Sequence, residues 1–320
     1  FGPNYTATAV LTVPDFSGNG VWEIVAVGVH DTTGEAVVRV KDARTGNLLT
    51  EIALGDEYPP TFVRAVPHYA GSPAQEIAVL GIGRTTRRIL ATIIDTGTGE
   101  KLGDVAFSSS LAPVDMAVLP DTGGTAAPDL VVLGVTPDVS GVVARIKDAS
   151  SGLWLRDLNF SQLYHPLGLT IVPTYGGSPA VEIAALSVHE TSGRVLARVK
   201  DAMSGEKIRD VYYSSSYVPA TLLSIADFAD TLAPELGVVG VHYASERVLT
   251  RSKDASSRST VSEVVYSANY PPDAVVVIPD VADSPAQEIV VLGEHPVNGT
   301  TLIRVKDAST GALIATIPVP

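Results

Sequence analysis

The chain has 320 residues, of which 45% are hydrophobic and 18% charged, and its formal net charge at pH 7 is −13. This composition excludes a disordered chain, and no apolar run approaches the roughly 20 residues of a membrane span. The acidic balance disfavours nucleic acid and membrane insertion, and the absence of cysteine excludes disulfides, thiolate metal sites and a cysteine nucleophile.

The first ten residues, FGPNYTATAV, lack the basic start and the apolar core of a signal peptide. A chain that begins this way is cytosolic, already processed, or excised from a longer protein. We favour a processed product that is extracellular or attached to a cell surface.

Four short segments in each part of the chain are predicted to be β-strands. The first, as in AVVVIP at 274–279, and the second, as in EIVAVGV at 23–29, are nearly continuous apolar runs, which predicts burial on both faces. The third, as in VVRVKD at 37–42, alternates basic with apolar residues, and the fourth, as in KIRDVYY at 207–213, is also mixed. We expect both of these to be half exposed. No segment shows a sustained helical period.

These segments recur with a period of 53 residues, which is the mark of a repeat architecture. Two acidic columns and one proline column follow it without an insertion. The hairpin column is Asp42, Asp95, Asp148, Asp201, Asp254 and Asp307; the second-strand column is Glu23, Glu76, Asp129, Glu182, Glu235 and Glu288; the proline column is Pro60, Pro113, Pro166, Pro219 and Pro272.

Four strands per repeat, repeated six times, predict an all-β, six-bladed β-propeller with four antiparallel strands per blade. Six periods cover nearly the whole chain, and the last residue occupies the position in the repeat that Gly2 occupies, so we expect one full circuit. We predict a single domain, 1–320, in which residues 1–7 are a closing linker. The expected blades are 8–60, 61–113, 114–166, 167–219, 220–272 and 273–320.

The hairpin strings, such as VKDARTG at 40–46, are predicted to be turns in which the carboxylate accepts amide hydrogen bonds and the glycine takes positive φ. The alternative is that six such carboxylates bind cations on a rim.

The loop between the first two strands of blade one, DFSGNGVWE, places oxygen donors at alternating positions: Asp15, Ser17, Asn19, the carbonyl of Val21, and Glu23. Hard cations such as calcium require an oxygen-rich loop of this kind. The loop resembles the FG-GAP repeat family, which includes the integrin α-subunit propeller and bacterial VCBS-type surface proteins. In that family the pattern DxNxDGxxD holds calcium here, so the resemblance implies a Ca²⁺ site in blade one only. The alternative is a turn in which Glu23 accepts backbone amides.

Two further columns bear on function. His30, His189, His242 and His295 end the second strands of different blades, and we expect structural roles in hairpins because the rings should lie too far apart to share a metal ion. The tyrosines precede the first strands and are expected at one mouth of the channel, where they could stack on sugar rings or seal adjacent blades. This column is Tyr5, Tyr58, Tyr164, Tyr217 and Tyr270, with Leu111 as its exception.

Several residues break the repeat, and a symmetric scaffold often acquires a site at such positions. These exceptions are Trp22, Trp154 and the basic run Arg84, Arg87 and Arg88. We predict no catalytic residue, because each carboxylate that might serve belongs to a repeated column with a turn role.

Three classes of function remain open. The leading hypothesis is a non-catalytic, secreted or cell-surface binding propeller that recognises a glycan or an extracellular protein, with calcium support at most in part. The second is a structural subunit of an extracellular assembly that self-associates, which the sequons at Asn4, Asn159 and Asn298 would suit. The third is a polysaccharide-active hydrolase or lyase.

Overall fold

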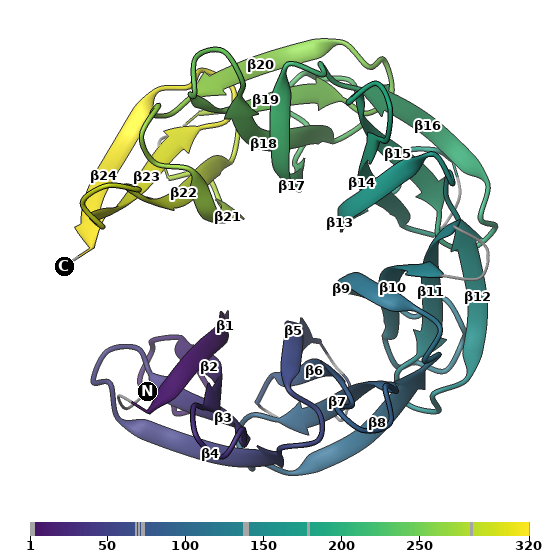
Figure 1. Ribbon diagram of the computed structural model, residues 1–320, viewed down its shortest axis with the longest axis vertical. Helices are drawn as coiled ribbons and strands as arrows, with labels where there is room; N and C mark the ends of the chain where they lie inside the picture. Colours follow the sequence, from purple (N-terminus) through teal and green to yellow (C-terminus); the bar gives the residue numbers. More distant parts are fainter. Residues whose placement is uncertain are drawn as a thin grey trace. The chain divides into compact units, whose positions relative to one another are not determined.

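The computed structural model describes residues 4–67, 69, 71, 74–136, 141–177, 180–281 and 284–319. These residues form 24 strands in six four-stranded antiparallel sheets, and they include no helix (Figure 1). None of the described segments therefore has the helical length and apolar character that a membrane crossing requires. The fold class predicted from the repeat, a six-bladed β-propeller with four strands per blade, is confirmed. Residues 1–3 of the predicted closing linker lie outside the described residues.

The chain divides into two compact units, Phe1–Asn159 and Phe160–Pro320. Unit 1 holds blades one to three, whose first strands lie next to one another in sequence order. Its strands are β1 (Tyr5–Val13), β2 (Glu23–His30), β3 (Ala36–Asp42) and β4 (Leu48–Gly55) in blade one, β5 (Pro60–Val66), β6 (Glu76–Ile82), β7 (Ile89–Asp95) and β8 (Lys101–Phe107) in blade two, and β9 (Ala112–Leu119), β10 (Asp129–Thr136), β11 (Gly141–Asp148) and β12 (Trp154–Asn159) in blade three.

Unit 2 holds blades four to six, and its first strands β13, β17 and β21 are likewise neighbours. Its strands are β13 (Tyr164–Val172), β14 (Glu182–His189), β15 (Val195–Asp201) and β16 (Lys207–Tyr212) in blade four, β17 (Tyr217–Ile225), β18 (Glu235–His242), β19 (Val248–Asp254) and β20 (Thr260–Val265) in blade five, and β21 (Pro272–Ile278), β22 (Glu288–Glu294), β23 (Thr301–Asp307) and β24 (Leu313–Val319) in blade six.

The strand register explains why the two acidic columns share one period. In every blade the acid that opens the second strand lies opposite the aspartate that ends the third, as in the pairs Glu23 with Asp42 and Glu235 with Asp254. Both carboxylates are buried, so each must find hydrogen-bond donors within its own blade.

The burial of the strands differs from the predicted gradient. The second strands are buried as expected, for example β6 and β10, but the first strands β1 and β21 are largely exposed. The third strands, expected to be half exposed, are mostly buried. The third strand is buried because it lies between two others in its sheet. Its basic side chains reach past the sheet, as Lys147 does in donating to the carbonyl of Gly152.

The apolar core lies between neighbouring blades of each unit. Blades one and two share a cluster that includes Val27, Val38, Val63 and Ile77, and blades two and three share a second one around Leu80 and Met116. Equivalent clusters join blades four and five and blades five and six. Each fully buried Val, Leu or Ile side chain contributes about 1.5–3 kcal/mol, so packing between blades provides much of the stability of each unit.

Candidate functional site

The predicted calcium ligands of blade one lie together, but their oxygen atoms accept the loop's own N–H groups. The Asp15 carboxylate accepts the amides of Gly18 at 2.7 Å and Gly20 at 2.6 Å. Ser17 donates its hydroxyl to Asp15 at 3.2 Å, and its amide donates to Glu23 at 3.1 Å.

Asn19 completes this network. Its amide nitrogen donates to Asp42 on the adjacent hairpin, and its side-chain oxygen accepts the amide of Val21 at 2.8 Å. Blades three and five fold in the same way without an asparagine, because Thr125 and Thr231 donate to their hairpin aspartates. A calcium ion in blade one would have to compete with these amides, and within the described part of the chain no group of three His, Asp or Glu side chains could hold a metal. The calcium site stays a prediction.

The hairpin aspartates have the turn role predicted for them. Burial acts to raise the pKa of Asp148, but hydrogen bonds from Ser151, Thr125 and Ser150 outweigh it and lower that pKa to about 2. The same pattern lowers the pKa of Asp307 to about 2. Three of the second-strand acids differ: burial raises the pKa of Asp129 and Glu182, and it raises the pKa of Glu235 to about 7.

The histidines accept hydrogen bonds in their own hairpins, as expected. The Nδ1 atoms of His30 and His189 accept the amides of Thr32 and Thr191, respectively, at 3.3 Å. This assigns the ring proton to Nε2. Three of the predicted ligand-binding tyrosines pack edge-on against these rings, namely Tyr5 on His30, Tyr164 on His189 and Tyr270 on His295.

The remaining tyrosines occupy the same position at the start of a blade. Tyr217 is 1% exposed, and Tyr58 is half-buried with its hydroxyl 3.4 Å from that of Thr86. Three members of the column carry an arginine of the third strand over their rings: Arg39 over Tyr5, Arg251 over Tyr217 and Arg304 over Tyr270. A sugar-binding role for the column stays a prediction.

A second aromatic column fills the space between blades. The residue that ends one blade lies beneath a lysine on the third strand of the next. The pairs are Phe107 with Lys147 in unit 1, and Tyr213 with Lys253 and Tyr266 with Lys306 in unit 2, at 5.8–5.9 Å. The ring and the cation attract each other, and together they close the gap between neighbouring sheets.

Blade two breaks this arrangement. The period places Leu54 where blades two to five end in an aromatic residue, Ile94 in place of the lysine, and Thr92 in place of the arginine. The last blade ends in Val319 at the position of Leu54. Leu54 packs with Ile94 in the cluster shared by blades one and two. Three large side chains are thus replaced by three smaller ones at a single position of the fold.

The replacement leaves a cavity of about 390 Å³ between blade one and blade two. We call it the 1/2 cavity. Its lining residues are Leu54, Tyr58, Val79, Gly81, Arg88, Leu90, Thr92, Lys101 and Asp104. Cavities of roughly 300–1,000 Å³ are typical of small-molecule sites. Gly81 is required there, because a Cβ atom would lie 2.8 Å from the carbonyl oxygen of Tyr58.

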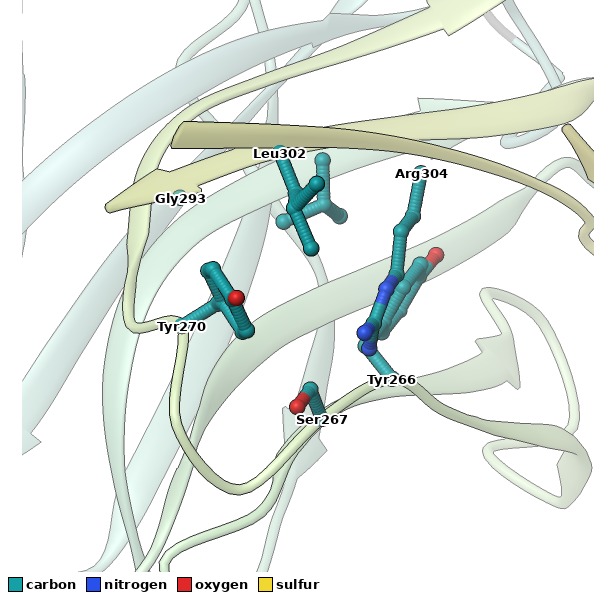
Figure 2. Close-up of a pocket in the computed structure, with 7 residues that line it drawn as sticks. Tyr266, Ser267, Tyr270, Gly293, Leu302 and Arg304 are labelled. Atoms are coloured by element: carbon teal, nitrogen blue, oxygen red, sulfur yellow. The ribbon is translucent and has the colours of Figure 1, made fainter. Parts of the chain in front are cut away.

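The equivalent position between blade five and blade six holds about 10 Å³, which is the space of one water molecule. We call it the 5/6 cavity. Figure 2 shows the side chains of Tyr266, Tyr270 and Arg304 that line it, with Arg304 beside the ring of Tyr266. The contrast arises within one fold, so the side chains and not the backbone decide whether the space is open.

The 1/2 cavity carries charges of both signs. Lys101 contacts Asp104 at 2.5 Å, and the Thr92 hydroxyl donates to the same carboxylate at 2.9 Å. Arg88 is exposed at the rim of the cavity. Among the described residues, no carboxylate forms an ion pair with its guanidinium.

The hairpin that carries Arg88 is tied to the preceding linker. Glu57 accepts the amides of Thr85 at 3.1 Å and Thr86 at 3.2 Å. The Thr86 amide makes the largest contribution to lowering the pKa of Glu57, so this carboxylate stays ionised. Arg87 has a φ of 56°, where three equivalent hairpins use Gly34, Gly193 and Gly299 and the hairpin of blade five uses Glu246 with a φ of 54°. A left-handed conformation is costly for a residue with a side chain, and blades two and five both carry this cost.

The sequence identified parts of this site but not the cavity. Tyr58 and the basic run at 84–88 were recognised as features of interest, whereas Thr92 and Ile94 were not, although each is an exception in a repeated column. The other exceptions, Trp22 and Trp154, are 56% and 58% exposed and line no part of it. The sequon residues Asn4, Asn159 and Asn298 are exposed.

Comparison with known proteins gives the fold alone. No protein-family model and no curated protein matches the chain. Among solved structures, the rhamnogalacturonan lyase YesW is similar over 99% of this chain and 58% of its own, with a TM-score of 0.55 and 15% identity. The Dos1 propeller covers 98% of this chain and 69% of its own, with a TM-score of 0.56 and 11% identity. BBS1N, from a complex with ARL6DN, covers 99% and 82%, with a TM-score of 0.59 and 13% identity. The chain thus spans less than two thirds of YesW.

Proposed function

We propose that this chain is a non-catalytic glycan-binding propeller, secreted or displayed at a cell surface, and that the 1/2 cavity holds one sugar residue of its ligand. The observation that supports this proposal is the cavity itself. It has the volume of a small-molecule site, whereas its equivalent between blades five and six is filled by the protein's own side chains.

The lining suits a sugar ring. Leu54, Leu90 and the ring of Tyr58 offer apolar surface to the C–H faces of a pyranose. Thr92 and Asp104 offer hydroxyl and carboxylate groups for its hydroxyls. A ligand bound in this way would be oriented by a few polar contacts within a largely apolar wall, which is the usual construction of a binding pocket.

The carboxyl groups favour binding over hydrolysis. Glycoside hydrolysis commonly uses two carboxyl groups on opposite sides of the scissile bond. Among the residues that line the 1/2 cavity only Asp104 has a carboxyl group, and its oxygens already contact Lys101 and the hydroxyl of Thr92. The likeness to YesW concerns the fold and carries no activity to this chain.

The test is glycan-array binding by the wild type and by Thr92→Arg. Arginine is the residue that the chain itself uses at the equivalent positions Arg145 and Arg251, where it pairs with an acid on the fourth strand. An arginine at position 92 faces Asp104 in the same way, because residues 92 and 104 are paired in the sheet. We expect a folded protein in which the cavity is filled and glycan binding is lost.

The matched control is Arg304→Thr, which makes the reverse exchange in the 5/6 cavity and should leave glycan binding unchanged. Binding that survives Thr92→Arg would place the ligand on another surface and contradict the proposal. Turnover of a polysaccharide by the wild type would instead support the enzyme alternative, and filaments of native material in electron microscopy would support a structural subunit.

A further inference from the structure

We propose that the sugar residue in the 1/2 cavity is acidic: a uronate whose carboxylate is bound by Arg88. This inference rests on the proposed function and adds the chemical class of the ligand.

Arg88 differs in its ion pairing from the arginines inside the blades. Arg145 and Arg198 each contact an aspartate on the neighbouring strand at 2.6 Å. Arg88 borders the cavity from the β6–β7 hairpin, and no carboxylate among the described residues forms an ion pair with it. Its charged group is therefore open to a ligand.

The other charges of the cavity are already balanced. Lys101 and Asp104 neutralise each other at 2.5 Å, and the remaining oxygen of Asp104 accepts the Thr92 hydroxyl. Glu57 of the preceding linker is ionised, but it accepts hydrogen bonds from the threonines of the hairpin and does not line the cavity. The net charge of the lining is consequently the single positive charge of Arg88.

The rest of the hairpin adds to this positive field. Arg84 and Arg87 belong to the same turn, so three arginines lie within five residues of a chain whose net charge is −13. Arg84 donates to the carbonyl of Gly34 in blade one, which is a neutral partner. A local positive surface of this kind attracts an anionic group into the adjacent cavity.

The shape of the guanidinium favours a carboxylate. Its planar N–H fork matches the two oxygens of a carboxylate and can bind them with two parallel hydrogen bonds. The apolar walls and Tyr58 leave space for the uncharged ring that carries this group. The acidity of the whole chain opposes a long polyanion, so we expect an isolated or terminal uronate in an otherwise neutral glycan.

The experiment is isothermal titration with two matched pairs of probes: methyl glucuronide with methyl glucoside, and methyl galacturonide with methyl galactoside. The proteins are the wild type, Arg88→Gln, Arg88→Lys, the same-hairpin control Arg87→Gln, and Thr92→Arg. The wild type should bind one uronide about tenfold more tightly than its neutral counterpart, which is the effect of one charge-assisted hydrogen-bond pair.

The variants separate the contributions of charge and shape. Arg88→Gln should abolish the preference, Arg88→Lys should retain part of it because the charge remains without the fork, and Arg87→Gln should keep most of it because Arg87 contributes only to the surrounding field. Thr92→Arg should remove binding of uronide and neutral sugar alike.

The outcomes distinguish the two proposals. If neutral and acidic sugars bind equally and Thr92→Arg removes both, the uronate assignment is wrong while the glycan function stands. If a sulfated methyl glucoside binds more tightly than either uronide, the carboxylate assignment is wrong. If no probe binds at millimolar concentration and the glycan array is also silent, both proposals are wrong.

Discussion

The 1/2 cavity and the 5/6 cavity occupy the same position of the repeat, yet one measures about 390 Å³ and the other about 10 Å³. The backbone around them is built alike, with a glycine that lets the tyrosine linker approach closely in both, Gly81 and Gly293. The difference lies in Leu54 and Thr92 against Tyr266 and Arg304. Two large side chains suffice to turn an open cavity into packed core, so a symmetric scaffold can hold a cavity between one pair of blades without any change of fold.

The largest effect is expected when the 5/6 cavity is opened by giving it the side chains of the 1/2 cavity. The double substitution Tyr266→Leu and Arg304→Thr removes buried ring surface, so we expect the free energy of unfolding to fall by about 2–4 kcal/mol. Urea unfolding followed by circular dichroism measures it. The opened cavity should not select uronides, because Thr300 and Leu313 stand where blade two has Arg88 and Lys101. Unchanged stability would show that these side chains do not fill the space.

The comparison extends to the buried acids that begin the second strands and to the aspartates that lie opposite them. Burial raises the pKa of Glu235 to about 7, so the folded protein keeps a proton that the unfolded chain releases above its ordinary pKa of 4.5. Stability is therefore lost as the pH rises from about 4.5 to 7. We expect Glu235→Gln to raise the free energy of unfolding at pH 8 by about 1–3 kcal/mol, and by less at pH 4.5.

Asp254, which lies opposite Glu235, is the matched control. Burial acts to raise its pKa, but hydrogen bonds from Ser257 and Thr231 lower it overall. Its ionised form therefore stabilises the fold, and Asp254→Asn should destabilise the protein at pH 8. Equal effects of the two substitutions would mean that the two carboxyl groups share one environment.

A smaller effect is expected when the open cavity is closed by Thr92→Arg. The new guanidinium faces Asp104 on the neighbouring strand. Because Asp104 is partly exposed and already contacts Lys101, the added pair should stabilise by about 0–1 kcal/mol. Differential scanning calorimetry measures the shift in Tm. A marked loss of stability would show that the cavity cannot accept the side chain that its equivalents hold, and would weaken the comparison.

The smallest expected effect concerns calcium in the loop of blade one. An ion there competes with the amides of Gly18 and Gly20 for the Asp15 carboxylate, so we expect weak uptake, with a Kd on the order of 10⁻³ M. Titration of chelator-treated protein measures it. Asp15→Ala should abolish the uptake, while Asp121→Ala in the equivalent loop of blade three should not. No uptake by the wild type would leave the loop as a turn alone.

The candidate site could be read from the sequence only in part. The sequence identified Tyr58, because it belongs to the repeated tyrosine column. It also identified the arginines at 84, 87 and 88, because they interrupt the 53-residue repeat. The sequence did not identify Thr92 as a site residue, because threonine is common on β-strands. Its importance depends on Leu54 and Tyr58, which approach it only when blade one packs on blade two. The sequence also predicted half-exposed third strands, whereas the structure buries them. The alternation of basic and apolar residues indicates which residues are polar, but it does not indicate whether the strand lies at the edge or in the middle of its sheet.

The sequence by itself determined the repeat and the number of blades, because a period of 53 residues recurs six times along the chain. The strand register of the structure added that the two acidic columns lie opposite each other. The tertiary structure decided which side chains fill the space between blades and which leave it open. That outcome depends on volumes contributed by residues far apart in the chain, and such volumes meet only when neighbouring sheets pack together.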